Sequence, residues 1–306
     1  MGEYLSIDES MYGNDLFTFL SHKDGHGKRG TLIAAVRGTK ADEVVKQLMT
    51  IPANRRNAVK EVTMDFSDSM YAIVRQCFPE AIIVIDCFHM VKRVCDGLDE
   101  IRMRYKRKAT SERKKEEKVF NRKRRFRKKA REYYRKRHPR KKGERRGRPH
   151  LRSNEKFQSQ PLSNGDTQVE LLTRARYILP KSGEKWSTNQ KNRVSLLFTM
   201  YPKLKEAYSL VCQLRCIFKN KSNNRNKAKK KLRDWYRKVS ISGIKEIISA
   251  KDCIKDKQEE VLNYFINHST NAAAESLNAK MKGFRSELRG VSDLKFYFYR
   301  CCLIFG

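Results

Sequence analysis

Two short β-branched runs, each followed at once by an aspartate, most constrain the fold of this chain. Val59–Met64 precedes Asp65, and Ile82–Ile85 precedes Asp86. Between them, Asp68–Cys77 has the apolar spacing of a short helix, with Asp68 expected as its N-cap. A strand, a helix and a second strand in this order predict a sheet covered by helices.

The first part of the chain predicts three more strands. Tyr4–Ile7 should end at Asp8, and Leu16–Leu20 and Thr31–Val36 should follow it, separated by a turn rich in glycine and charge. Residues 41–51 have helical spacing and stop at a proline. The predicted fold class is therefore α/β, with a mixed sheet flanked by helices.

The charge of the chain indicates its partner. A formal net charge of +35 over 306 residues is typical of proteins that bind a polyanion, most simply nucleic acid. A membrane-surface protein is the alternative. However, no run approaches 18 apolar residues, and no basic stretch precedes an apolar one at the N-terminus.

The basic residues concentrate in one segment. Residues 101–150 hold 26 Lys or Arg against five Glu. This segment is either a solvated basic helix or disordered linker, or a phosphate-binding segment with interleaved aromatic residues. The candidate DNA-binding residues are Arg122, Lys123, Arg124, Arg125, Arg135, Lys136 and Arg137.

The remainder of the chain reads as helical. Amphipathic spacing recurs through residues 168–265, and residues 271–284 form a last predicted helix, with Thr270 as a plausible N-cap. The eight cysteines lack CxxC pairs, which favours buried thiols in a reducing cytoplasm over a zinc site at Cys212 and Cys216.

Carboxylates at strand ends suggest a metal-dependent site. Asp8 and Asp65 would lie close together if their strands are neighbours, and the repulsion of such a pair favours a cation between them. Magnesium prefers oxygen ligands, and two ions about 4 Å apart can activate the attacking oxygen and stabilise the leaving one. The candidate third carboxylate is Glu275, which shares about two helical turns with Asn278 and Lys282.

Each of these residues also has a simpler interpretation. A single Asp after a strand is more often a turn or cap residue, and Glu9 should point to the opposite face of its strand. His89 could be a core histidine bonded to the backbone. Trp235 could be a packed aromatic or a base-stacking residue.

Taken in order, these residues resemble a known family. Asp8, Asp65, the Asp86-Cys87-Phe88-His89 segment and Glu275 after a long helical stretch are similar to an RNase H-like DDE transposase. More narrowly, the chain resembles the bacterial insertion-sequence transposases of the ISL-three group. The most specific segments are FPEAIIVIDCFHMVK and TNAAAESLNAKMK, and the likeness covers nearly the whole chain.

The resemblance implies roles for these residues. Asp8, Asp65 and Glu275 would be the catalytic, metal-binding triad for two Mg²⁺ ions, with Mn²⁺ as a substitute. Asp86 and His89 would support the site, together with Asn278 and Lys282. The implied activity is cleavage of double-stranded DNA at transposon ends and transfer to a target, by a homo-oligomer on DNA in the bacterial cytoplasm, at the nucleoid.

The resemblance also implies an organisation. Residues 1–92 and 269–306 would form the RNase H-like core, and 93–268 a basic helical insertion whose residues 102–150 could be flexible. Two departures stand out. Ser276 replaces the glycine that usually follows the glutamate, and no zinc-binding or helix-turn-helix region precedes Asp8. We therefore expect either a separate end-recognition polypeptide or a truncated copy.

Two other functions stay open at this point. One is a non-catalytic DNA- or RNA-binding protein, such as an inactive transposase remnant. The other is an RNase H-type nuclease or resolvase without strand transfer.

Overall fold

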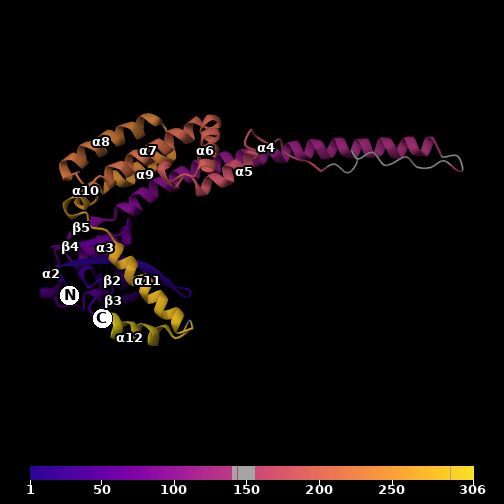
Figure 1. Cartoon of the computed structure of the whole chain (residues 1–306). Coiled ribbons are helices and arrows are strands. Elements are labelled where there is room, and N and C mark those ends of the chain that lie inside the picture. The colour runs from indigo at the N-terminus through magenta and orange to yellow at the C-terminus, as the bar shows by residue number, and fades with distance from the viewer. Residues whose placement is uncertain (140–142, 144–155, 290) are drawn as a thin grey trace. The chain divides into compact units, whose positions relative to one another are not determined.

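The computed structural model of the chain describes residues 1–139, 143, 156–289 and 291–306. It contains two compact units (Figure 1). The first joins residues 1–96 and 209–306, and the second comprises residues 97–208. The three-part division into 1–92, 93–268 and 269–306 stays a prediction.

The first unit is built on a five-stranded mixed sheet. Its strands are β1 (Tyr4–Tyr12), β2 (Asp15–His22), β3 (Leu32–Arg37), β4 (Glu61–Met64) and β5 (Ile82–Ile85), in the order β3-β2-β1-β4-β5. The first three strands pair antiparallel, whereas β4 pairs parallel with both β1 and β5. This topology confirms the predicted α/β, RNase H-like fold class.

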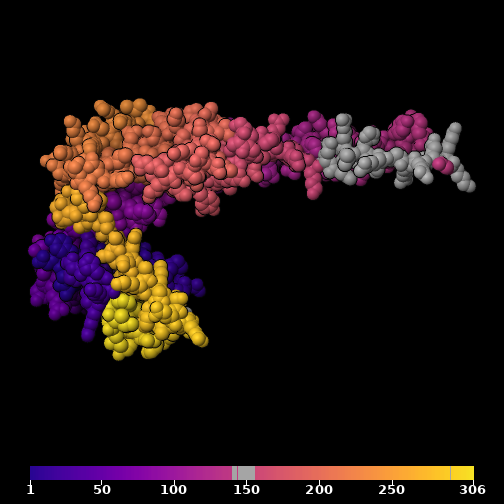
Figure 2. Space-filling model, viewed as in Figure 1, coloured from indigo at the N-terminus to yellow at the C-terminus, as the bar shows by residue number. Residues whose placement is uncertain are grey.

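Helices cover both faces of this sheet. Helices α1 (Ala41–Leu48), α2 (Ala53–Asn57) and α3 (Asp68–Cys77) follow β3 and β4, and α1 and α3 bury a core with Leu5, Ile7 and Val62. Tyr12, Phe17 and Phe19 form a second core with α11 (Ala272–Glu287) and α12 (Leu294–Phe305). Tyr297 of α12 donates to the carbonyl of Met281 in α11 at 2.6 Å, and the two helices lie side by side at the yellow end of the chain (Figure 2). The alternation along β1 thus sends Ile7 to one face and Asp8 to the other.

Further helices complete the chain. They are α4 (Cys87–Arg137), α5 (Gln168–Arg174), α6 (Thr188–Met200), α7 (Pro202–Lys219), α8 (Arg225–Ser242), α9 (Lys245–Asp256) and α10 (Gln258–Asn267). Trp235 in α8 is 1% exposed, and its indole N–H donates to the Leu210 carbonyl at 2.8 Å. Trp235 is therefore a core residue.

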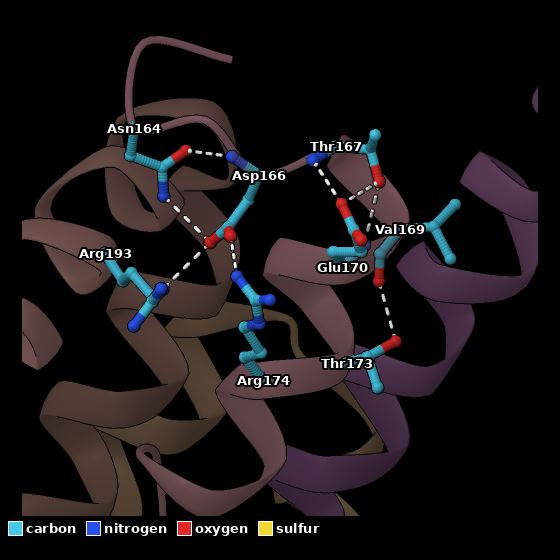
Figure 3. A network of polar contacts seen from close by, with 8 residues as sticks. All are labelled: Asn164, Asp166, Thr167, Val169, Glu170, Thr173, Arg174 and Arg193. Carbon is cyan, nitrogen blue, oxygen red and sulfur yellow. Dashed lines mark hydrogen bonds and ion pairs between the residues drawn. The ribbon is translucent and has the colours of Figure 1, made fainter. Parts of the chain in front are cut away.

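The second unit is held by a buried carboxylate (Figure 3). Asp166 is 3% exposed, and it accepts hydrogen bonds from Arg193 Nε at 2.8 Å, from Asn164 Nδ2 at 3.0 Å and from Arg174. Next to it, Thr167 and Glu170 form a capping box that begins α5. These bonds tie the loop before α5 to both α5 and α6.

Several local expectations were wrong. β1 does not end at Asp8 but continues to Tyr12, because its antiparallel pairing with β2 extends beyond its parallel pairing with β4. Ser67, not Asp68, caps α3, since its side chain accepts from the Met70 N–H. The N-cap position of α11 is Asn271, not Thr270. Helix α1 ends at Leu48 rather than at residue 51.

The cysteines are free, as expected, but not all are buried. Cys77 and Cys301 are buried, whereas Cys216 and Cys302 are exposed. No helix within the described residues combines the length and the apolar character needed to cross a membrane.

Candidate active site on the first unit

Three aspartates lie side by side where the parallel pairing of β1, β4 and β5 ends, and we call this place the aspartate edge. Ile7 is paired with Met64, and Met64 is paired with Ile85. The next residue on each of these parallel strands is Asp8, Asp65 or Asp86. Because neighbouring parallel strands in register place successive residues side by side, the three carboxylates share one edge. The condition set for Asp8 and Asp65, that their strands are neighbours, is met.

Asp8 is nearly closed off from solvent. Its side chain accepts the Glu9 backbone N–H at 2.8 Å on Oδ1 and Asn278 Nδ2 at 2.7 Å on Oδ2. Burial raises the pKa of the Asp8 carboxyl above its usual value, and these two hydrogen bonds lower it by less. The positive charge of Lys282 on α11 also lowers that pKa.

Asp65 lies between a histidine and an amide. His89 Nε2 and Asn271 Nδ2 approach the same oxygen, Oδ1, at 3.1 Å and 3.0 Å. Burial, together with the nearby charge of Asp8 and against the lowering effect of His89, raises the pKa of Asp65 to about 6. A bound cation would stabilise the charged form of a buried carboxyl that has this pKa and a like-charged neighbour.

Both side-chain oxygens of Asp86 accept hydrogen bonds from backbone N–H groups. One oxygen accepts the Phe88 N–H at 2.9 Å, and the other accepts the Asn271 N–H at 3.2 Å. Its side chain therefore fixes the first turn of α4 and the chain entering α11, and the residue is 3% exposed. Asp86 thus contacts the backbone around the site, and His89 contacts Asp65 itself.

Helix α11 carries the remaining predicted residues. Leu277 and Asn278 are buried against the sheet, while Glu275 and Lys282 are exposed. At about 100° per residue, Glu275 lies about 40° around the helix axis from Asn271 and about 60° from Asn278, on one stripe. Within the described residues, however, the Glu275 side chain has no recorded hydrogen bond or ion pair. Nor is any set of three or more His, Cys, Asp or Glu there arranged to hold a metal ion.

The donor atoms at this edge nevertheless fit a hard cation. Asp8 and Asp65 supply two carboxylates, and Oδ1 of both Asn271 and Asn278 is buried without a hydrogen-bond donor. Carboxylate and amide oxygens are the ligands that Mg²⁺ and Mn²⁺ prefer. Two amide oxygens beside these carboxylates thus lack a hydrogen-bond donor in the described part of the chain.

Sequence reasoning missed Asn271. Its side chain bonds to Asp65 and to the Ile7 carbonyl, and its backbone bonds to Asp86. The available signal was an amide directly before the Ala-Ala-Ala-Glu helix start, repeated seven residues later as Asn278. A spacing of seven returns to nearly the same helix face.

The predicted DNA-binding residues lie on α4 in the second unit. This helix is continuous for 51 residues, and its buried side chains end at Ala109. The candidates are exposed, and guanidinium groups lie over aromatic rings, Arg122 over Phe126 at 5.9 Å and Arg137 over Tyr133 at 4.9 Å. The disordered-linker alternative is therefore wrong for residues 102–137. Positions 140–142 and 144–150 lie outside the described residues.

Comparisons with known proteins match the chain to one family. Residues 5–301 match the family DDE_Tnp_ISL3, which is described as transposase. Searches of curated proteins and of solved structures gave no match. The family match spans both sheet aspartates, the long helix α4 and the α11 glutamate, and it confirms the resemblance found in the sequence. The chain belongs to the DDE_Tnp_ISL3 family of transposases.

Proposed function

We propose that the chain catalyses metal-dependent cleavage of DNA strands at transposon ends and their transfer to target DNA. Asp8, Asp65 and Glu275 are the proposed catalytic residues and ligands of two Mg²⁺ ions. The observation that carries the proposal is the in-register placement of Asp8 and Asp65 on neighbouring strands, next to the helix that bears Glu275. The family supplies the reaction class, since its members are transposases.

The side chains divide the work among them. Bound Mg²⁺ supplies Lewis-acid activation of an attacking oxygen and stabilises the leaving oxygen. Asp8 and Asp65 provide the negative charge that recruits the ions, and His89 holds one oxygen of Asp65 at 3.1 Å. Asp65 Oδ2 has no recorded hydrogen bond in the described chain and is the oxygen available as a ligand. Lys282 provides a cation on the exposed side of α11, suited to a DNA phosphate.

Glu275 completes this set in the proposal. It lies on the α11 stripe that contacts the aspartates, and its exposed carboxylate is accessible to an ion and to DNA. Because α11 packs against the sheet, the backbone of Glu275 has a defined position next to the aspartates.

The positive charge of the chain gathers the substrate. Exposed cations and aromatic rings on α4 are suited to phosphate and sugar contacts, so we assign the helix to double-stranded DNA. We further propose a homo-oligomer on DNA that pairs two ends, acting at the bacterial nucleoid in the cytoplasm. A separate polypeptide could supply end recognition.

A nicking assay tests the proposal. Asp65→Asn should lose Mg²⁺- or Mn²⁺-dependent cleavage of DNA that carries the element's ends, by at least about 10³-fold, while DNA affinity changes little. Asp68→Asn is the matched control, because Asp68 begins α3 close by, with its side chain 94% exposed and paired with Lys257. It should cleave like the wild type.

Other outcomes distinguish the alternatives. Cleavage by Asp65→Asn equal to that of the wild type refutes the assignment. Hydrolysis without joining of a labelled 3′-hydroxyl end indicates a nuclease without strand transfer. Binding without metal-dependent cleavage by the wild type indicates a non-catalytic remnant.

A further inference from the structure

Asn271 occupies the N-cap position of α11 but does not cap the helix. Asparagine at this position normally accepts a hydrogen bond from a backbone N–H of the first turn. The Asn271 side chain makes no such bond. Instead its amide nitrogen donates to Asp65 Oδ1 at 3.0 Å and to the Ile7 carbonyl at 3.3 Å. The capping ability of this side chain is therefore given up for contacts with the sheet.

The same residue contacts the chain at three neighbouring strands. Its backbone N–H donates to Asp86 Oδ2 at 3.2 Å, after β5, while its side chain contacts Ile7 of β1 and Asp65 after β4. Asn271 is 1% exposed, so these bonds are shielded from water. One buried residue thus fixes where α11 begins relative to all three aspartate-bearing strands.

A second amide fixes the rotation of the helix. Asn278, which is 7% exposed, donates to Asp8 Oδ2 at 2.7 Å. Two attachments seven residues apart restrain the rotation of α11 about its axis and its sliding along that axis. Glu275 lies between them, four residues after Asn271 and three before Asn278.

We propose that Asn271 is a positioning residue, which anchors α11 to the aspartate edge so that Glu275 is presented to the cation held by Asp8 and Asp65. This inference rests on the proposed function, because it assumes that Glu275 is a metal ligand. Asn271 acts through Glu275 and does not itself bind the cation or the substrate.

A serine substitution separates this role from ordinary capping. Serine is as good an N-cap residue as asparagine, but its side chain is too short to keep the bonds to Asp65 and Ile7. If Asn271 only stabilises the helix start, Asn271→Ser is harmless. If Asn271 positions Glu275, Asn271→Ser is as damaging to metal binding as Asn271→Ala.

The experiment measures Mn²⁺ affinity of the full chain by electron paramagnetic resonance of the free ion. Loss of an outer-shell partner typically weakens metal binding about 10- to 100-fold, and we expect this for Asn271→Ser and Asn271→Ala. Asn267→Ala is the control, because Asn267 lies four residues upstream and donates to Glu61 at 3.0 Å instead of to an aspartate. Thermal melting without metal checks that each variant is folded.

A double variant tests whether Asn271 acts through Glu275. In Asn271→Ser combined with Glu275→Gln, Mn²⁺ affinity should equal that of Glu275→Gln alone, whereas independent effects would add. Wild-type affinity in folded Asn271→Ser, or additive losses in the double variant, overturns the inference and leaves the proposed function intact. Absence of Mn²⁺ binding by the wild type overturns both.

Discussion

His89 Nε2 lies 3.1 Å from Asp65 Oδ1, on an oxygen that Asn271 Nδ2 also approaches at 3.0 Å. His89 is the third residue of α4, directly after β5, and the helix start is fixed by Asp86. The four-residue segment from Asp86 to His89 therefore positions His89 through two linked contacts. Asp86 orients the first turn of the helix, and the helix then directs His89 at Asp65.

Removing His89 should change the pH dependence of the site. The positive charge that His89 can carry lowers the pKa of Asp65, so His89→Ala should raise that pKa above about 6. Protons then compete with the metal ion for Asp65 up to a higher pH. The acidic limb of the pH–rate profile of Mn²⁺-dependent cleavage should therefore shift to higher pH. A pH–rate profile of wild type and His89→Ala checks this. An acidic limb at the same pH in wild type and His89→Ala contradicts the contact between His89 and Asp65.

In the metal-free protein, the contribution of Asp65 to stability should become more favourable as the pH falls from 7 towards 4. The folded-state pKa of Asp65, about 6, lies above its unfolded value of 3.8, so the folded protein binds this proton more tightly. The cost of the charged form is fully present above pH 6, on the order of 3 kcal/mol, and disappears as the carboxyl is protonated. Asp65→Asn should remove this dependence, and urea unfolding in chelator at several pH values measures it. Equal slopes of unfolding free energy against pH for wild type and Asp65→Asn contradict this prediction.

The local elements were predictable from the sequence because their signals are local. The bounds of α3 and β5 match the prediction, since a helical apolar spacing and a β-branched run each depend only on neighbouring residues. The prediction of a sheet covered by helices followed from the alternation of strands and helices along the chain. The family resemblance then predicted that the aspartates and the glutamate act as one set.

The contacts that assemble the site were not predictable. Asn271 and Asp65 are 206 residues apart, and Asn278 and Asp8 are 270 apart, so no local pattern reports either bond. The extension of β1 beyond Asp8 depends on pairing with β2, which the apolar pattern of β1 alone does not contain. The capping of α3 by Ser67 rather than Asp68 is a one-residue shift that propensity cannot resolve, because both residue types cap helices well.

Neutralising cations of α4 should weaken DNA binding and its salt dependence. Replacing Arg122, Lys123 and Arg125 with Gln should reduce the slope of log affinity against log salt concentration by about 3, if each contacts a phosphate. The control replaces three exposed cations of the first unit, Lys40, Lys46 and Arg55. Fluorescence anisotropy with a duplex over a range of salt concentrations measures both. Equal slopes for the two triple variants would argue against α4 as the DNA contact.

Breaking the Asp166 network should destabilise the second unit without affecting metal binding (Figure 3). Asp166→Asn leaves Arg174 and Arg193 without their carboxylate, at a cost of about 3 kcal/mol. Asp234→Asn is the control, because its surface ion pair with Arg237 should contribute less than about 1 kcal/mol. Chemical unfolding gives both values. A loss for Asp166→Asn no larger than for the control contradicts the structural role.

The central claim is that Asp8, Asp65 and Glu275 belong to one metal site. Thermal stability during a Mn²⁺ titration tests it most directly, with wild type beside Asp8→Asn and Glu275→Gln. Because a ligand that binds only the folded state stabilises it, the wild type should gain about 3 kcal/mol at a Mn²⁺ concentration 100 times its dissociation constant. Both variants should lose most of this gain. A full gain in Glu275→Gln would remove Glu275 from the site, and no gain in the wild type would contradict the account as a whole.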